Sequence, residues 1–170
     1  MAEKFIINGE NKLKGVVEVR GSKNAAFPVI MAALLSEEDC FIENMPLIED
    51  AMKVLEILAS MGVDVKWIGE RSVKINAKNF DYSKINETLV ARLRGSILLF
   101  GALLGRIDKI NLPQPGGCVI GARPIFTHLD AFAQMGINVY PQIKKFELSV
   151  EKRKPGYVVL NEFSVTATSN

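Results

Sequence analysis

The residues with the most chemical potential lie in one glycine-rich run, from Pro115 to Pro124. Cys118 stands among three glycines in this run, and Arg123 follows five residues later at the expected start of a helix. A nearby cation and a helix N-terminus make a thiol more acidic and therefore more reactive. Glycines let the backbone approach a ligand closely. We therefore predict a reactive cysteine at position 118, and a surface turn with an incidental cysteine is the alternative.

A second candidate group is a lysine in the run Gly21 to Pro28. Proline is tolerated in the first turn of a helix but disrupts a helix already under way. We therefore expect the helix to begin near Ala25 or Ala26, which leaves Lys23 and Asn24 in the preceding loop. A lysine beside the exposed N–H groups of a helix start can hold a phosphate or a carboxylate. A solvated turn lysine is the simpler alternative.

Arg92 and Arg94 stand two residues apart in an expected helix and so lie on different faces. One of them could face an anionic ligand while the other stays in water, and an arrangement with both in water is the alternative. His128, the single histidine, has no partner at metal-ligand spacing, and a helix-surface or capping role is expected. Cys40 lies beside Phe41 and Ile42, where we expect an inert core residue.

Composition narrows the class of protein that must position these groups. The chain has 170 residues, of which 48% are hydrophobic and 24% charged, with a formal net charge of +2. This near balance of charge argues against a nucleic-acid or membrane-surface footprint. Two cysteines make no disulfide framework, no signal peptide is visible, and the apolar stretches are too short to span a bilayer. A cytoplasmic globular protein is expected.

The sequence repeats itself. Ala33–Leu35 recurs as Ala102–Leu104, an offset of 69, and Ala59–Val65 recurs in altered form as residues 133–139, an offset of 74. The second copy has therefore gained 74 − 69 = 5 residues between the two anchors, where it carries the longer loop Leu112 to Cys118. An insertion confined to one loop of a repeat is a good place to look for function.

Each copy is predicted to form a helix, a strand, a second helix and a strand hairpin. The elements expected in copy one are helices Phe27–Ser36 and Glu49–Met61, with an apolar stripe of Met52, Leu55, Ala59 and Met61, and strands Cys40–Glu43, Val63–Trp67 and Ser72–Asn76. Those in copy two are helices Glu87–Leu104 and Pro124–Met135 and strands Lys109–Leu112, Ile137–Tyr140 and Lys145–Val150. Gly62 is expected at a left-handed helix C-cap. Residues 158–168 resemble residues 17–25 and are interpreted as the opening of a third copy, with no helix expected before Asn170.

These motifs together resemble the enolpyruvyl transferase family. The resemblance rests on Gly21–Ala26, Arg94–Ser96 and the run Pro115 to Pro124, and it extends over all 170 residues. It implies an α/β fold in which a lobe is built from βαβαββ-type repeats. Residues 1–21 would belong with an absent second lobe, and residues 22–170 would form an incomplete lobe. That lobe would hold repeat one (about 22–90), repeat two (about 91–155) and the start of repeat three (156–170).

The resemblance also implies an activity and roles for the candidate residues. Family members add the 3-hydroxyl of UDP-N-acetylglucosamine to phosphoenolpyruvate and release phosphate, which is the first committed step of peptidoglycan synthesis. No metal or other cofactor is implied, and the general base would come from the absent lobe. Cys118 would donate a proton to the enol carbon, and Lys23, Arg94 and Arg123 would hold the carboxylate and phosphate charges. Asn24 would contact the substrate. The residues implied at the uridine diphosphate end are Arg123, Pro124 and Ile125, together with Ser164 and Val165.

Two departures from the family pattern and three alternatives remain. Phe126 replaces a common aspartate and Thr166 a usual glycine, both near the nucleotide end.

A sister enzyme that acts on shikimate 3-phosphate shares the fold and the lysine turn, but it lacks the glycine-cysteine loop. A non-catalytic half that binds a nucleotide sugar is the second alternative. An RNA cyclase with related repeats would need a more basic surface. The fragment alone is expected to be inactive.

Overall fold

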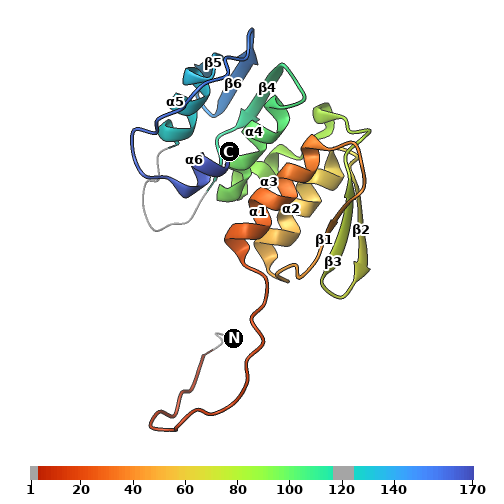
Figure 1. The fold of residues 1–170 in the computed structure, drawn as a ribbon, viewed down its shortest axis with the longest axis vertical. Coiled ribbons are helices and arrows are strands. Elements are labelled where there is room, and N and C mark those ends of the chain that lie inside the picture. Colours follow the sequence, from red (N-terminus) through yellow and green to blue (C-terminus); the bar gives the residue numbers. More distant parts are fainter. Residues whose placement is uncertain (1–3, 117–124) are drawn as a thin grey trace.

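The fold consists of two α/β units and the start of a third (Figure 1). The computed structural model describes residues 4–116 and 125–170. The first unit comprises helix α1 (Lys23–Ala32), the 3-10 turn η1 (Ala33–Leu35), strand β1 (Cys40–Ile42), helix α2 (Glu49–Ser60), and strands β2 (Asp64–Gly69) and β3 (Ser72–Asn76). The second comprises η2 (Tyr82–Lys84), α3 (Glu87–Arg92), η3 (Arg94–Ile97), α4 (Leu98–Leu104), β4 (Lys109–Pro113), α5 (Phe126–Gln134), β5 (Ile137–Pro141) and β6 (Lys145–Val150). The third begins with α6 (Val165–Ser169).

The two sheets have the same topology, which confirms the predicted repeat. Each has three antiparallel strands, in the orders β1-β3-β2 and β4-β6-β5. In both units the helix before the hairpin ends at a left-handed glycine, Gly62 with φ of 84° and Gly136 with φ of 82°. These two glycines stand 74 residues apart, which is the offset of the second anchor. Gly62 therefore has the C-cap conformation that the sequence predicts.

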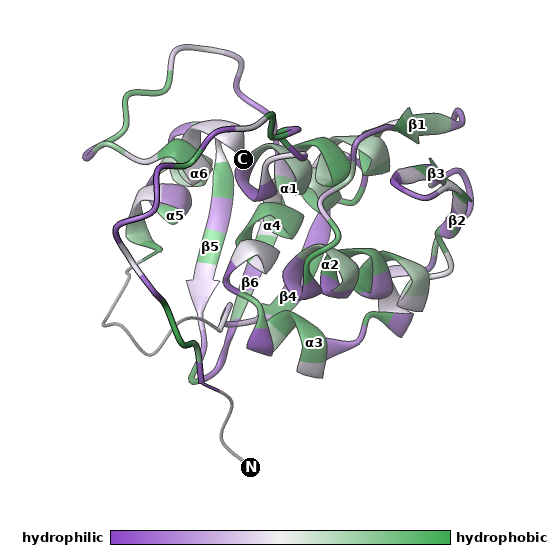
Figure 2. Ribbon diagram, turned by 90° about the horizontal axis from the view of Figure 1, so that it is seen from below, coloured by the Kyte–Doolittle hydropathy of each residue, from purple (hydrophilic) through white to green (hydrophobic). Residues whose placement is uncertain are grey.

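One hydrophobic core runs through both units. Figure 1 shows helices α1 to α4 between the two sheets. Helices α1, α2 and α4 each contribute buried residues to this core, and Figure 2 shows the apolar stretches of these helices in green. The largest fully buried side chains include Ile30, Leu34, Ile57, Leu99 and Phe100. Because the helices share this core, the ends of α1 and α3 are fixed relative to one another.

Helix α1 begins earlier than predicted. Ser22 is the N-cap residue, its carbonyl accepts a 2.9 Å hydrogen bond from the N–H of Ala26, and Lys23 is the first helical residue. Pro28 accordingly lies inside the helix, in its second turn. The expectation that Lys23 and Asn24 lie in a loop was therefore wrong. Burial of Ala26 and Phe27 against the core fixes these turns and outweighs the local preference of Pro28.

The helix predicted over Glu87–Leu104 is broken at Leu93, whose backbone is extended (φ −112°, ψ 120°). The buried hydroxyl of Ser96 lies 2.6 Å from the Leu93 carbonyl oxygen and 2.8 Å from that of Val90, so its proton is shared between the carbonyl groups at the break. Gly95 packs against Phe27 of α1, and a Cβ added there would lie 2.1 Å from the ring. Tertiary packing against α1 therefore interrupts a segment whose composition favours a continuous helix.

Smaller differences concern the helix faces and ends. In α2 the buried stripe is Ala51, Val54, Leu55, Ile57 and Leu58, followed by Met61 beyond the helix end. Ala59 is exposed and Met52 half-buried, so the predicted stripe was partly wrong. Helix α5 begins at Phe126, two residues later than predicted.

The last segment contains a short helix, α6, where none was expected. Ser164 caps α6 by accepting a 3.2 Å hydrogen bond from the N–H of Ala167. This position corresponds to Ser22 before α1, because residues 158–168 resemble residues 17–25. The helix therefore agrees with the interpretation of this segment as the opening of a third copy.

The N-terminal residues of the described chain carry no helix or strand up to Ser22. Figure 1 shows this stretch running away from the two units. Its apolar side chains are exposed, among them Phe5, Leu13 and Val16, each at 96% or more. Among the described helices, none is long and apolar enough to cross a membrane.

Candidate functional site

Lys23 lies at the first position of α1 and forms an ion pair with Asp50 in the first turn of α2. The Lys23 side chain is half exposed, and its Nζ also lies 5.8 Å from the centre of the Phe27 ring. Phe27 itself is buried. Asn24, the next residue of the helix, is exposed. An exposed ammonium group therefore has a defined position at a helix start, where an anion is also favoured by the helix dipole.

The loop before α2 brings Asp50 to this position. Asn44 has a positive φ of 52°, and the N–H of Met45 donates to the Arg71 carbonyl at 2.8 Å. Gly21 packs so closely on this loop that an added Cβ would lie 1.9 Å from the Asn44 carbonyl oxygen. The starts of α1 and α2 are thus held side by side by backbone contacts. Asp50 was not predicted from the sequence, because its local sequence is the same as that of any acidic residue in the first turn of a helix.

Arg94 lies next to the residue that packs on α1. It opens η3, and the neighbouring Gly95 contacts the Phe27 ring one turn along α1 from Lys23. Arg94 is half-buried, whereas Arg92 at the end of α3 is exposed. The two arginines therefore differ in exposure, which agrees with the first of the two expectations for them, although no single continuous helix carries them. Packing of Gly95 on Phe27 brings the Arg94 segment to the helix that carries Lys23.

His128 on α5 is buried rather than on a helix surface, which corrects the expectation for this residue. The N–H of Gly101 donates to Oδ1 of Asn170 at 2.9 Å, so Nδ2 of Asn170 faces Nδ1 of His128 at 3.0 Å. Nδ1 must then accept, and Nε2–H can donate to the Thr166 hydroxyl at 3.2 Å. Burial, followed by the positive charge of Arg94, lowers the pKa of His128 to about 4.

This arrangement places α6 against α5 and near Arg94. Thr166, at a position where the resemblance implies glycine, is the hydrogen-bond partner of His128. Ser164 caps α6 and is half-buried, while Val165 is exposed at 61%. Ile125 is buried at the N-terminal end of α5. The residues expected at the uridine diphosphate end therefore lie at the starts of two helices joined through His128.

Three of the predicted site residues, Cys118, Arg123 and Pro124, lie outside the described residues. The described chain stops on one side at Gly116 and resumes at Ile125. Gly116 is packed on α3, since a Cβ there would lie 1.9 Å from the Ala91 carbonyl oxygen. The last described residue before this segment, Gly116, therefore lies beside the end of α3, and the first one after it, Ile125, directly precedes α5.

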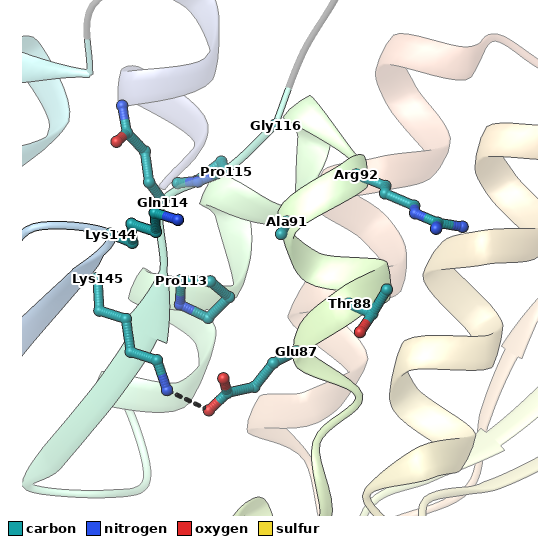
Figure 3. Close-up of a pocket in the computed structure, with 10 residues that line it drawn as sticks. All are labelled: Glu87, Thr88, Ala91, Arg92, Pro113, Gln114, Pro115, Gly116, Lys144 and Lys145. Atoms are coloured by element: carbon teal, nitrogen blue, oxygen red, sulfur yellow. Dashed lines mark hydrogen bonds and ion pairs between the residues drawn. The ribbon is translucent and has the colours of Figure 1, made fainter.

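The end of α3 also borders a cavity of about 610 Å³ (Figure 3). It is lined by Glu87, Thr88, Ala91, Arg92, Lys144, Lys145 and the segment 113–116. Figure 3 shows the ion pair that closes one end, in which Lys145 Nζ lies 2.7 Å from Glu87 Oε1, and it shows the Arg92 side chain directed away from the cavity. This cavity was not predicted from the sequence, because its walls come from three separate segments, the outermost of which are more than 50 residues apart.

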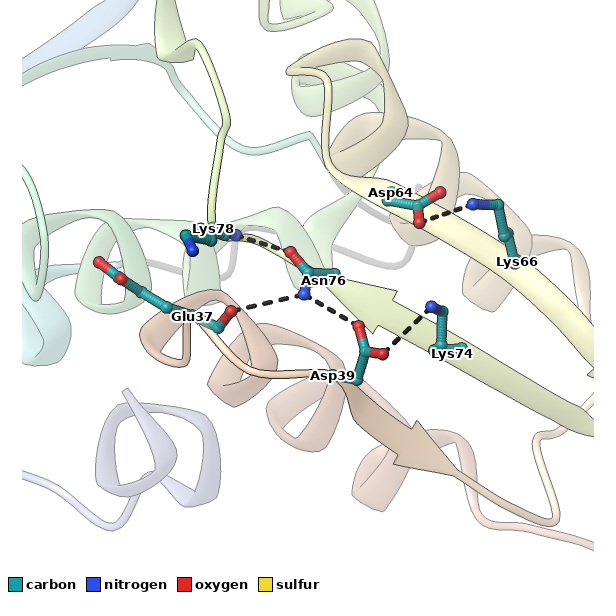
Figure 4. A network of polar contacts seen from close by, with 7 residues as sticks. All are labelled: Glu37, Asp39, Asp64, Lys66, Lys74, Asn76 and Lys78. Carbon is teal, nitrogen blue, oxygen red and sulfur yellow. Dashed lines mark hydrogen bonds and ion pairs between the residues drawn. The ribbon is translucent and has the colours of Figure 1, made fainter.

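A polar network on the outer side of the first sheet has a structural role (Figure 4). Asn76 donates to Asp39 at 2.9 Å, and Lys74 lies 3.2 Å from the same carboxylate. The hydrogen bond from Asn76 lowers the pKa of Asp39 most, and the one from Lys74 lowers it further. The network joins β3 to the residues before β1. In the two described ranges, no group of three His, Cys, Asp or Glu side chains could hold a metal ion.

Lys23 and Arg94 lie on segments that pack on each other through Phe27 and Gly95, in a lobe built from two α/β units with the same sheet topology. This repeated fold is that of an enolpyruvyl transferase lobe. The chain belongs to the family described as EPSP synthase (3-phosphoshikimate 1-carboxyvinyltransferase), whose model matches residues 7–170. The resemblance noted in the sequence is thereby confirmed.

Individual relatives agree with this assignment. A UDP-N-acetylglucosamine 1-carboxyvinyltransferase of Bradyrhizobium diazoefficiens is 39% identical over 98% of this chain and 38% of its own length. One of Idiomarina loihiensis is 37% identical over 99% of this chain and 40% of its own length. The crystal structure of the enolpyruvyl transferase NikO from Streptomyces tendae superposes with a TM-score of 0.73 and 26% identity, over 86% of this chain and 32% of that chain. The chain thus spans about two-fifths of the length of the curated relatives.

Proposed function

We propose that this chain is part of an enzyme that transfers the enolpyruvyl group of phosphoenolpyruvate to the 3-hydroxyl of UDP-N-acetylglucosamine. The observation that carries the proposal is the match, along 98% of this chain, to a relative named for this transfer. The reaction would be the first committed step of peptidoglycan synthesis, in the cytoplasm. Formation of the cell wall, and through it cell shape and division, would depend on it.

In the proposed mechanism, three cationic side chains hold the charges of the reaction. The sugar hydroxyl gives its proton to a general base outside this chain as its oxygen forms a bond to C2 of phosphoenolpyruvate, while C3 receives a proton, for which Cys118 is the proposed donor. The tetrahedral intermediate then loses phosphate, and loss of a proton from C3 restores the double bond. Lys23, Arg94 and Arg123 are proposed to hold the carboxylate and phosphate groups, because cations placed where charge develops are a main catalytic contribution.

Contacts to the rest of the substrates are proposed as follows. Asn24 is exposed beside Lys23 and can reach the same ligand. Ile125, Ser164 and Val165, together with Pro124, are proposed to contact the nucleotide end, which the positions of the α5 and α6 starts support. The general base is proposed to lie outside this chain.

We also propose that residues 1–21 belong with a second lobe of the same protein. Extended apolar residues such as Phe5 and Val16 have no contact surface in this chain, since both are almost fully exposed. Burial of apolar surface is favourable, so a surface outside residues 22–170 is expected to cover them. The other lobe would complete the cleft in which both substrates bind.

Two other functions remain as candidates. Transfer to shikimate 3-phosphate is favoured by the description of the family model. The solved EPSP synthase of Acinetobacter baumannii is 18% identical, with a TM-score of 0.66, and so supports the fold alone. A non-catalytic half that binds a nucleotide sugar is favoured by the two-fifths of the relatives' length that the chain spans.

A chimera separates these candidates. This chain would replace the aligned part of the Bradyrhizobium diazoefficiens relative, which supplies the rest of the protein. With phosphoenolpyruvate, the chimera is expected to convert UDP-N-acetylglucosamine to a product carrying the added enolpyruvyl mass and to leave shikimate 3-phosphate unchanged. The unchanged relative, expressed in the same way, serves as the positive control. Conversion of shikimate 3-phosphate, or binding of the nucleotide sugar without turnover by a folded chimera, would contradict the proposal.

A further inference from the structure

We propose that Asp50 is an internal counter-ion of Lys23. A substrate anion must compete with the Asp50 carboxylate for the Lys23 ammonium group, so Asp50 sets the affinity of this site for phosphate and carboxylate groups. The inference rests on the proposed function in so far as Lys23 is an anion-binding group. Asp50 would act on the ligand indirectly, by way of Lys23. It belongs to a different helix, and its carboxylate would repel the same anions that Lys23 attracts.

The ion pair is held from both sides. Lys23 extends over the Phe27 ring, with 5.8 Å from Nζ to the ring centre, and Phe27 is wedged against Gly95. Asp50 belongs to a first turn fixed by two hydrogen bonds, from the N–H groups of Ala51 and Met52 to the Ile48 carbonyl, both at 3.1 Å. The pairing of the two side chains therefore follows from how the helices pack.

The pair is also open to a ligand. The Lys23 side chain is 50% exposed and that of Asp50 is 36% exposed. An ammonium group has three donors, and Asp50 is the acceptor that the structure gives it. An anion can therefore reach the ammonium group from the solvent side. The negative charge of the bound anion would then lie close to the negative charge of the Asp50 carboxylate.

The neighbouring residue provides a matched control. Glu49 stands next to Asp50 in the same first turn and pairs with Lys53 one turn along α2, with 2.6 Å between Nζ and Oε1. Both carboxylates are at the same helix end, so removing either charge changes the helix dipole interaction similarly. Removal of Asp50 alone would change the balance of charge at Lys23.

Simple electrostatics predicts the direction and size of the effect. Two like charges about 5 Å apart in a water-like dielectric repel by an amount equal to about fourfold in a binding constant. The Asp50→Asn change keeps the shape and removes this repulsion. It is expected to strengthen anion binding at Lys23 by about fourfold or more, with little effect on stability, because exposed ion pairs contribute little to it.

The experiment is an NMR titration of this chain with inorganic phosphate and with phosphoenolpyruvate at constant ionic strength. The amide signals of residues 22–26 report on the site. We expect the dissociation constant to fall by about fourfold or more in Asp50→Asn and to stay unchanged in Glu49→Gln. The Lys23→Ala variant should bind more weakly, and Lys23→Ala/Asp50→Asn should gain little over Lys23→Ala.

Two contrary results would have different meanings. Unchanged or weaker binding in Asp50→Asn, with binding still lost in Lys23→Ala, would overturn the counter-ion role and leave the proposed function standing. Equal binding by the parent chain and Lys23→Ala would show that Lys23 is no anion site, which overturns the inference together with the role assigned to Lys23 in the proposed mechanism. Thermal unfolding of each variant shows whether a change in binding reflects folding.

Discussion

At the level of single residues, Lys23 and Arg123 are proposed to act on ligand charge rather than on folding. Exposed ion pairs contribute between about 0 and 1 kcal/mol, so loss of the Lys23–Asp50 pair should cost little stability. In the chimera, Lys23→Ala and Arg123→Ala are each expected to keep the melting temperature and to reduce turnover by roughly a hundredfold or more. Lys53→Ala, which removes the neighbouring ion pair of α2, is the control and should change neither. A large fall in melting temperature with normal kinetics would show that the two cations have a structural role.

The two cysteines should differ in reactivity. Cys40 is half-buried in β1, directly opposite Ile75 of β3, so it is more accessible than the core residue expected from the sequence but still shielded on one face. Cys118 belongs to a glycine-rich run with Arg123 nearby in sequence. We predict that iodoacetamide modifies Cys118 faster than Cys40, with a rate that rises with pH through a midpoint below about 8.5.

Peptide mapping after limited labelling decides this prediction. A Cys118→Ser variant should lose the fast-labelled peptide and keep the slow one. In the chimera the same thiol should open the epoxide of fosfomycin, and Cys118→Ser should abolish that adduct. Faster labelling of Cys40, or equal and slow labelling of both, would contradict the role proposed for Cys118.

His128 should make stability depend on pH. Its pKa is about 4 in the folded chain and about 6.5 when unfolded, because burial and then Arg94 disfavour the protonated ring. Between these values the unfolded chain binds more protons, so the stability that neutral His128 contributes is complete above pH 6.5 and is lost as the pH falls toward 4. The urea midpoint should fall over this range, and His128→Asn should flatten the part of the curve due to this residue. An identical slope in both proteins would contradict the assignment.

At the level of elements, the contact between η3 and α1 holds the proposed site together. A Cβ on Gly95 would lie 2.1 Å from the Phe27 ring, and this ring is buried and cannot move freely. Gly95→Ala is therefore expected to destabilise the chain by roughly 1–3 kcal/mol, as overpacking usually does. Gly9→Ala, at an open position, is the control. Chemical denaturation measures both.

A second change separates packing from backbone conformation at Gly95. Phe27→Leu removes the ring atoms that the new Cβ would meet, so the double variant should lose less stability than the sum of the two single changes. Full additivity would show that the cost of Gly95→Ala does not come from the ring contact.

The sequence predicts the elements better than their ends. Hairpins and glycine C-caps are local sequence patterns. Gly62 and the two strands after it were predicted correctly because a glycine follows an amphipathic segment and apolar residues alternate with polar ones beyond it. The break at Leu93 was not, because its cause is the packing of Gly95 on a helix 68 residues away. The same holds for Lys23, whose place in α1 depends on the core contacts of Ala26 and Phe27.

The site was predicted from motifs in part. Lys23 and Arg94 were selected by residue type and resemblance, and the structure brings their segments together through Phe27 and Gly95. Asp50 and the environment of His128 could not be predicted, because they depend on which helices pack together. Cys118 and Arg123 stay predictions, since they lie outside the described residues.

At the level of the whole molecule, the two units share one core, whereas the apolar side chains of the N-terminal stretch are exposed. The chain spans 38–40% of the length of the relatives cited above. Orientation of two substrates in a closed cleft contributes several kcal/mol to reactions of this kind. We therefore propose that this chain supplies substrate-binding groups and that turnover needs the complete protein.

Phosphate release from phosphoenolpyruvate in the presence of UDP-N-acetylglucosamine tests this account most directly. The isolated chain, with its mass verified, should stay at the background rate. The chimera with the Bradyrhizobium diazoefficiens relative should release phosphate only when both substrates are present, and its Cys118→Ser variant should lose most of that rate. Turnover by the isolated chain, or a folded chimera that stays at background while the parent relative is active, would contradict the account.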